Sequence, residues 1–358
     1  MESHEVIDLK SLSRSALSSF IEGLGFPKYR ADQIFRWMYQ SGVAEFDEMT
    51  NLPLADRQRL ADVAFLGSLK MIRDFRSSDG TIKILFALPS ARKIETVLIP
   101  DFDSTGKAVR TTVCVSSQVG CAMGCTFCAT GLMGFHENLD SGQIFDQVFY
   151  ANRLSEQTFS RPVSNIVYMG MGEPFLNFGA VLDSVNKITS SSGLEMAPKR
   201  ITISTVGLAA RIRDFADAHT RCNLAVSLHA PTDQKRSSIM PINKKRKTDL
   251  EALKGAVIYY TGRTGLPVTY EYCMFSGFND SEADALALAA VTKWAPSKVN
   301  LIMYNPVDST GFQRTEETQL DRFIRILVKK RIRVTVRRSR GQDINAACGQ
   351  LAAENLPA

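Results

Sequence analysis

The sequence has no long apolar run and no apolar segment behind a basic start, and both absences narrow the class of protein. No stretch approaches the roughly 18 consecutive apolar residues that a membrane-spanning helix needs. The first ten residues, MESHEVIDLK, are polar and acidic, whereas a secretory signal peptide carries an apolar core after basic residues. We therefore expect a cytoplasmic protein with no membrane partner, in a compartment where structural disulfides are rare.

Low-complexity tracts and short-period repeats are also missing, which argues against a disordered chain. Instead, 44% of the 358 residues are hydrophobic, enough to fill a substantial core. At about 150 residues per domain, this length allows one large domain and a smaller one. The net charge of +6, from 43 basic and 37 acidic residues, fits a polyanionic partner but is common among ordinary enzymes.

The N-terminal part of the chain has helical spacing. Leu17, Phe20, Ile21 and Leu24 repeat as one buried face of a helix does. We expect residues 1–75 to form a small helical accessory domain, and the sequence leaves open whether it contacts RNA or only packs against the main domain. Two β-rich runs, at 82–86 and 94–99, predict a β-rich connection over 76–110.

From residue 111 to 350, strands and helices alternate. Six β-rich runs begin near residues 112, 165, 200, 223, 268 and 299, and several are followed by helical stretches, namely Ser141–Arg153, Asp249–Thr261 and Glu282–Trp294. This alternation predicts an α/β fold of parallel βα units, most simply an incomplete barrel whose site lies on the loops after the strands. A last strand at 332–337 precedes a C-terminal segment that ends in a tail at 351–358.

Three of the seven cysteines, Cys121, Cys125 and Cys128, fall within eight residues directly after the first of these strands. Structural zinc would need a fourth ligand nearby, and the only candidate, His136, fits no usual zinc-finger spacing. Three thiolates suit a [4Fe–4S] cluster that keeps one iron open for a small molecule, whereas electron-transfer ferredoxins generally use four. Free buried cysteines and an open zinc site remain as alternatives.

The spacing of these cysteines at the end of a first barrel strand resembles the radical S-adenosylmethionine (SAM) superfamily. Further motifs in matching order resemble its RlmN/Cfr family of RNA adenine methyltransferases over nearly the whole chain. They are CVSSQVGC at 114–121, MGMGEP at 169–174, SLHAP at 227–231, MPIN at 240–243 and DINAACGQ at 343–350.

The resemblance implies a partial (βα)6 radical SAM barrel in which Cys121, Cys125 and Cys128 hold a [4Fe–4S] cluster and SAM chelates the open iron. One electron then splits SAM to give a 5′-deoxyadenosyl radical, chemistry that belongs to the cofactor. The SAM-binding positions that it implies stand at or after strand ends: Gly172, Glu173, Ser204, Ser227, Leu228, His229 and Asn305.

Methylation at adenine C2, which is electron-poor, needs more than a methyl donor. By resemblance, Cys348 takes a methyl group from a first SAM, and a radical made with a second SAM activates this methyl for addition to C2. Glu95 then accepts the C2 proton, and Cys114 resolves the adduct through a transient disulfide with Cys348. On the residues alone, Glu95 is more simply a solvated strand residue, and Cys114 and Cys348 are small buried hydrophobes. Cys222 and Cys273 are interpreted as core residues.

The resemblance also implies the partners. These are 23S rRNA, a subset of tRNAs modified next to the anticodon, and an external electron donor such as flavodoxin, with the enzyme acting as a monomer. Two basic concentrations, at 243–247 and 329–340, are candidate RNA contacts. We favour the second, because it leads into the Cys348 loop and a flipped-out base must be seated there.

Three alternatives remain at this point. A Cfr-type enzyme would methylate adenine C8. Val119 and Pro174 argue against this alternative, because Cfr-type enzymes usually have cysteine and alanine at these two positions. Ala129-Thr-Gly131, in contrast, is also found among Cfr-type enzymes. A zinc-stabilised RNA-binding protein would have no activity. A radical SAM enzyme with another substrate would have no need of Cys348.

Overall fold

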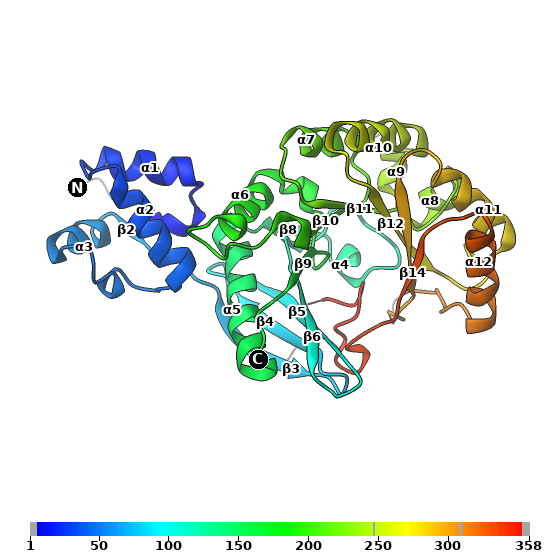
Figure 1. Ribbon diagram of the computed structural model, residues 1–358, viewed down its shortest axis with the longest axis horizontal. Helices are drawn as coiled ribbons and strands as arrows, with labels where there is room; N and C mark the ends of the chain where they lie inside the picture. Colours follow the sequence, from blue (N-terminus) through cyan, green and yellow to red (C-terminus); the bar gives the residue numbers. More distant parts are fainter. Residues whose placement is uncertain (1–5, 246–247, 308–309, 353–358) are drawn as a thin grey trace.

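The computed structural model describes residues 6–245, 248–307 and 310–352. In these ranges its centre is a ten-stranded sheet with the strand order β14-β13-β12-β11-β10-β9-β6-β5-β4-β3 (Figure 1). The strands of this sheet are β3 (Lys70–Arg76), β4 (Ile82–Ala87), β5 (Lys93–Phe102), β6 (Ala108–Cys114), β9 (Asn165–Tyr168), β10 (Ile201–Thr205), β11 (Asn223–Ser227), β12 (Val268–Met274), β13 (Ser297–Met303) and β14 (Val334–Arg337).

From β6 to β14 every neighbouring pair of strands in this sheet is parallel. Helices follow these strands and cover the outside of the curved sheet (Figure 1). They are α5 (Ser141–Phe159), α6 (Phe178–Thr189), α7 (Ala209–Asp217), α8 (Asp233–Ile239), α9 (Ile242–Lys245), α10 (Leu250–Thr264), α11 (Glu282–Val291) and α12 (Glu317–Lys329). The α/β class and the partial βα barrel are confirmed. The barrel gains one strand beyond the six expected, because β14 pairs in parallel with β13.

The β-rich region before the barrel is part of the same sheet. Strands β3, β4, β5 and β6 pair in antiparallel order, with Val97 opposite Cys114. The sequence predicts two strands and a connection here, and the structure adds β3 and joins all three to the barrel edge. This edge gives the barrel a further wall, on which Glu95 and Val97 lie.

The N-terminal helices form a small unit beside the barrel (Figure 1). They are α1 (Arg14–Gly23), α2 (Tyr29–Arg36) and α3 (Leu54–Ala61), with a short parallel pair of β1 (Ile7–Asp8) and β2 (Ala64–Phe65). A buried polar cluster fastens this unit to α5 and α6. In it Lys10 pairs with Asp146, and the Lys10 carbonyl accepts hydrogen bonds from Lys187 at 2.9 Å and from the Tyr39 hydroxyl at 3.0 Å.

Local capping residues set the helix ends, and periodicity alone predicts some of these ends at the wrong residue. Helix α5 starts where expected, with Asp140 capping it through a reciprocal bond with Gln143, but continues six residues past the predicted end. Helix α10 starts after the Asp249 cap and ends at Gly265 in the left-handed conformation that glycine adopts readily. Within the described residues, no helix combines the length and the apolar character needed to cross a membrane.

Candidate active site

A cavity lies at the carboxyl ends of the parallel strands. Each parallel strand from β6 to β14 contributes at least one lining residue at or just after its end. The loop after β14 and the antiparallel strand β5 contribute further lining residues. Its empty volume is about 1220 Å³, part of it open to solvent. Such a space accommodates a drug-sized ligand together with a second group.

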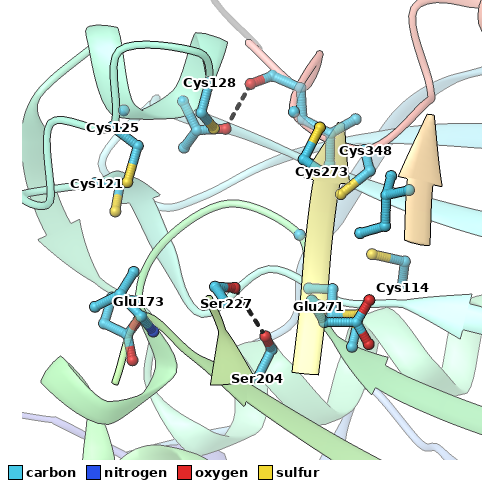
Figure 2. Close-up of a pocket in the computed structure, with 18 of the residues that line it drawn as sticks. Cys114, Cys121, Cys125, Cys128, Glu173, Ser204, Ser227, Glu271, Cys273 and Cys348 are labelled. Atoms are coloured by element: carbon cyan, nitrogen blue, oxygen red, sulfur yellow. Dashed lines mark hydrogen bonds between the residues drawn. The ribbon is translucent and has the colours of Figure 1, made fainter. Parts of the chain in front are cut away.

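The thiols of Cys121, Cys125 and Cys128 all line this cavity (Figure 2). Cys121 follows β7 (Gln118–Gly120), which pairs with β8 (Phe135–Asn138), and Cys128 precedes the short helix α4 (Ala129–Leu132). The loop between them is held by hydrogen bonds from the Cys121 amide to the Gly134 carbonyl at 2.7 Å and from the Thr126 amide to the Ile239 carbonyl at 3.0 Å. The loop therefore presents the three thiols from a fixed backbone.

Burial makes these thiols poor anions without a metal. It raises the pKa of Cys121 to about 12 and also raises the pKa values of Cys125 and Cys128. Among the described residues, no three His, Cys, Asp or Glu side chains converge as a single-ion site requires. In an iron–sulfur cluster each cysteine binds a different iron, so the thiols only need to face one space. Three thiols on one cavity fit such a cluster.

Glu173 stands beside the three thiols with its carboxylate held by backbone amides. One oxygen accepts from the Phe175 amide at 3.1 Å and the other from the Val206 amide at 2.8 Å. Burial raises its pKa to about 7. Gly172 precedes it at φ +99°, where an added Cβ would lie 2.6 Å from Gln118. The site thus offers a buried acceptor to an amine.

The remaining predicted SAM positions divide into two groups. Ser204, Ser227 and His229 line the cavity, and the two serine hydroxyls lie 3.4 Å apart (Figure 2). Burial, and then the nearby charge of Arg236, lowers the pKa of His229 to about 3, so its ring is neutral, and its Nδ1 accepts the Cys273 amide at 3.0 Å. The Leu228 side chain is fully buried and does not line the cavity.

Asn305 acts on the Cys348 loop and is not part of the cavity lining. Its side-chain amide donates to the Cys348 carbonyl at 3.2 Å, and its oxygen accepts from Gln342 at 2.8 Å. The adjoining part of the loop is fixed to α4, since the Ala129 amide donates to the Gly349 carbonyl at 2.8 Å. Segments far apart in sequence therefore place Cys348.

Cys114 and Cys348 line the same cavity as the three clustered thiols (Figure 2). Cys114 ends β6, and Cys348 reaches in from the loop after β14, exposed to the cavity. Burial raises the pKa of Cys114 to about 12. Cys348 has open space beside it, but the surrounding protein still desolvates its thiol and raises its pKa, while the positive charge of Arg337 opposes both shifts. With Cys273, which also lines this cavity, one chain thus brings six thiols to one space.

Glu95 is buried, not solvated. It lies on β5 two residues before the lining residue Val97, and one oxygen pairs with the Lys83 ammonium at 2.9 Å. The other oxygen accepts a hydrogen bond from the Ala352 amide at 2.9 Å. The sequence-based interpretation of Glu95 as an ordinary exposed strand residue is therefore wrong.

Three lining residues carry chemistry that sequence reasoning missed: Glu271, Cys273 and Arg337. Glu271 and Cys273 lie two residues apart on β12 and therefore point to the same face of the sheet. This alternation was the one sequence signal that could have placed both side chains at the site. Arg337 was assigned to a basic run expected to meet RNA. The structure separates that run, since Lys329 and Arg333 precede β14 and therefore lie at the opposite end of the strand from the cavity. Of the other run, 246–247 lie outside the described residues.

Comparison with known proteins places this geometry in a family. Residues 7–66 match the family described as "Ribosomal RNA large subunit methyltransferase N-terminal domain", and residues 115–289 match "Radical SAM superfamily". A probable dual-specificity RNA methyltransferase RlmN from Salinibacter ruber is 57% identical over 97% of this chain and 94% of that protein. The dual-specificity RNA methyltransferase RlmN of Anaeromyxobacter dehalogenans is 42% identical over 98% of this chain and 93% of its own.

A solved structure agrees with these sequence matches. The radical SAM methyltransferase from Sphaerobacter thermophilus is 43% identical and superposes with a TM-score of 0.89, covering 97% of this chain and 100% of that one. Nearly the whole length of this chain is thus matched by relatives of one kind, and the chain belongs to the RlmN family of radical SAM RNA methyltransferases.

Proposed function

We propose that the protein methylates C2 of adenosine in 23S rRNA and, in a subset of tRNAs, of the adenosine next to the anticodon. The observation that carries this proposal is the meeting of Cys114 and Cys348 with Cys121, Cys125 and Cys128 around one cavity. Relatives at 40–57% identity named as dual-specificity RNA methyltransferases support the two classes of RNA.

In this proposal Cys121, Cys125 and Cys128 hold a [4Fe–4S] cluster, and SAM binds beside it. The bound cluster and SAM supply a radical able to take hydrogen from a methyl group. Glu173 receives the SAM amine. Its carboxylate is a buried acceptor directly after Gly172, and hydrogen bonds from two backbone amides hold it in one orientation. Ser204, Ser227, Leu228, His229 and Asn305 complete the proposed SAM-binding set, Leu228 through its backbone and Asn305 through the Cys348 loop.

Cys348 carries the methyl group. Its thiolate takes the methyl group from one SAM. A second SAM provides the radical that activates this methyl group, so two SAM molecules are used per turnover. The activated carbon on the Cys348 sulfur then bonds to adenine C2. Glu95 accepts the C2 proton. The adduct also gives up one electron, which the cluster would accept. The Cys114 thiolate then attacks the Cys348 sulfur, and the bond from that sulfur to the new methyl carbon breaks. The electron pair stays with the carbon, which takes up a proton to complete the methyl group, and the Cys114–Cys348 disulfide that forms must be reduced by an external thiol before the next turnover.

The partners follow from this chemistry. An external one-electron donor such as flavodoxin would supply the electron that the bound cluster needs. The five cysteines with proposed roles all come from one chain, which supports a monomer as the working unit. The RNA substrates support a cytoplasmic location.

The test is mass spectrometry of 23S rRNA and tRNA from cells with and without the gene. We expect 2-methyladenosine to disappear from both RNAs in its absence. Loss of 8-methyladenosine with 2-methyladenosine retained would instead assign the C8 activity of Cfr-type enzymes, and loss of neither would refute the proposal.

A further inference from the structure

Lys83 and Glu95 form a buried ion pair on the wall of the barrel beside the cavity. They lie diagonally across the antiparallel strands β4 and β5, where Lys83 stands opposite Val97 and Leu85 opposite Glu95. Their charged atoms are 2.9 Å apart, and the side chains are only 6% and 2% exposed. A buried pair adds little net stability compared with apolar residues of the same size. Its presence beside a cavity therefore calls for another role.

Both members of this pair also hold the loop that carries Cys348. The Lys83 ammonium donates to the Asn345 carbonyl at 3.4 Å. The second oxygen of Glu95 accepts from the Ala352 amide at 2.9 Å. The segment 345–352 is thus tied at its two ends to one ion pair, and Cys348 lies between the ties. In Figure 1 this C-terminal segment, in red, runs from β14 back toward the antiparallel strands.

The geometry leaves Lys83 few other functions. Its aliphatic stem is buried, and its ammonium also lies 5.3 Å from the centre of the Phe75 ring. It does not line the cavity, so it is placed to act on Glu95 and on the loop and not on a ligand directly.

We propose that Lys83 is a positioning residue that holds the Glu95 carboxylate in one orientation and fastens it to both ends of the Cys348 loop. This inference rests on the proposed roles of Glu95 and Cys348. It deepens them, because the proton acceptor and the methyl carrier then approach the adenine as one assembly.

A consequence follows for the order of events. When Glu95 accepts the C2 proton it becomes neutral, and a neutral carboxyl binds an ammonium and a backbone amide less strongly than a carboxylate does. Proton transfer therefore loosens the segment 345–352 at the stage when the Cys348 sulfur must meet Cys114.

The first test measures the loop itself in the cluster-loaded enzyme without RNA, by hydrogen exchange over residues 345–352. Lys83→Met and Glu95→Gln should each speed this exchange roughly tenfold or more, the factor expected when a hydrogen bond to a charged group is lost. Lys83→Arg should stay close to the wild-type rate. Lys107→Met, at an exposed lysine in the turn between β5 and β6, is the matched control and should change nothing. Unchanged exchange in folded Lys83→Met would overturn the proposal.

The second test measures release of the RNA–protein adduct in a single turnover. Lys83→Met and Glu95→Gln should each retain the adduct at least about tenfold longer than wild type, and Lys83→Arg should release it at a rate close to wild type. If Glu95→Gln retains adduct while Lys83→Met releases it at the normal rate, Lys83 has no positioning role. If neither Glu95→Gln nor Cys114→Ala retains adduct, the proposed function fails, and the exchange experiment still decides whether Lys83 holds the loop.

Loss of Lys83 alone leaves a buried carboxylate unpaired and can prevent folding. The double variant Lys83→Met/Glu95→Gln removes both charges and keeps the shape of the pair. Hydrogen exchange over residues 345–352 in the double variant should be as fast as in Glu95→Gln. A wild-type exchange rate in the double variant would contradict the proposal that the ion pair holds this loop.

Discussion

Glu173 shows how one buried side chain makes ligand binding depend on pH. Burial raises its pKa from the ordinary value to about 7, so the carboxylate is mostly protonated at pH 6 and mostly charged at pH 8. The charged form is the one that accepts hydrogen bonds from an amine. We therefore expect the cavity to bind an amine-bearing ligand better on the alkaline side of neutrality.

We expect the dissociation constant of SAM for the cluster-loaded enzyme to fall about tenfold between pH 6 and pH 8, the change in the charged fraction of a group with this pKa. Equilibrium binding at several pH values measures it. Glu173→Gln should bind more weakly and without this pH dependence. A flat profile for the wild-type enzyme would show that the Glu173 carboxylate does not receive the ligand.

Cys114 and Cys348 differ in exposure, which suits different tasks. Cys348 is exposed to the cavity, whereas Cys114 is buried at the end of β6. We expect Cys114→Ala to form the covalent bond to RNA and fail to break it, because the thiol that resolves the adduct is missing. Denaturing gel electrophoresis shows this as protein that migrates with RNA, and Cys222→Ala, at a buried cysteine away from the cavity, should not. Normal turnover by Cys114→Ala would refute its resolving role.

At the scale of elements, the hairpin of β7 and β8 fixes the cysteine loop. Gly120 ends β7 with φ +70°, and a Cβ there would lie 1.9 Å from the Gly134 carbonyl oxygen. Backbone cannot move aside as a flexible side chain can, so the hairpin has to open if Gly120 is replaced.

We expect Gly120→Ala to lower the free energy of unfolding by at least about 2 kcal/mol and to reduce the iron bound per chain. Gly124→Ala is the matched control in the same loop. Gly124 also has a positive φ, but nothing lies within 4 Å of its Cβ position, so only backbone strain of about 1 kcal/mol is expected. Thermal unfolding and iron analysis compare the two variants, and equal losses would contradict the role of the Gly134 contact.

The elements themselves were largely predictable, and their pairing was less so. Alternating apolar runs indicated the parallel strands and the helices between them, since each pattern is local. The joining of β3, β4 and β5 to the barrel depends on contacts between distant strands and left no local sign. Arg337 was not predictable for a similar reason. It belongs to a basic run in the sequence, but it lies at the end of β14 that faces the cavity, whereas Lys329 and Arg333 precede this strand.

The meeting of Cys121, Cys125 and Cys128 at one cavity was predictable because the three cysteines are close in sequence. The Cys348 loop was assigned by resemblance alone. Its position depends on bonds to Asn305, Ala129 and Glu95 from three separate parts of the chain. Spacing in the sequence contains no information about such distant partners.

At the scale of the whole molecule, one cavity serves every proposed chemical step, while the N-terminal unit lies beside the barrel and is fastened to it through Lys10, Asp146 and Lys187.

The metal should therefore be needed for chemistry and not for binding RNA. We expect anaerobically purified protein to be brown with about four irons per chain. Chelation of the iron should abolish SAM cleavage and leave RNA affinity nearly unchanged, as measured by binding titration. Colourless, zinc-loaded protein with full RNA affinity would instead support a binding protein.

The most direct measurement follows the methyl group itself. Protein whose Cys348 carries a fully deuterated methyl group is given unlabelled SAM, a reductant and RNA, and the 2-methyladenosine formed in one turnover is analysed by mass spectrometry. If a hydrogen atom is taken from the methyl on Cys348 before it reaches C2, the product methyl keeps two of its three deuterium atoms. A product with all three, or with none, would show that the methyl does not pass through an activated carbon on Cys348.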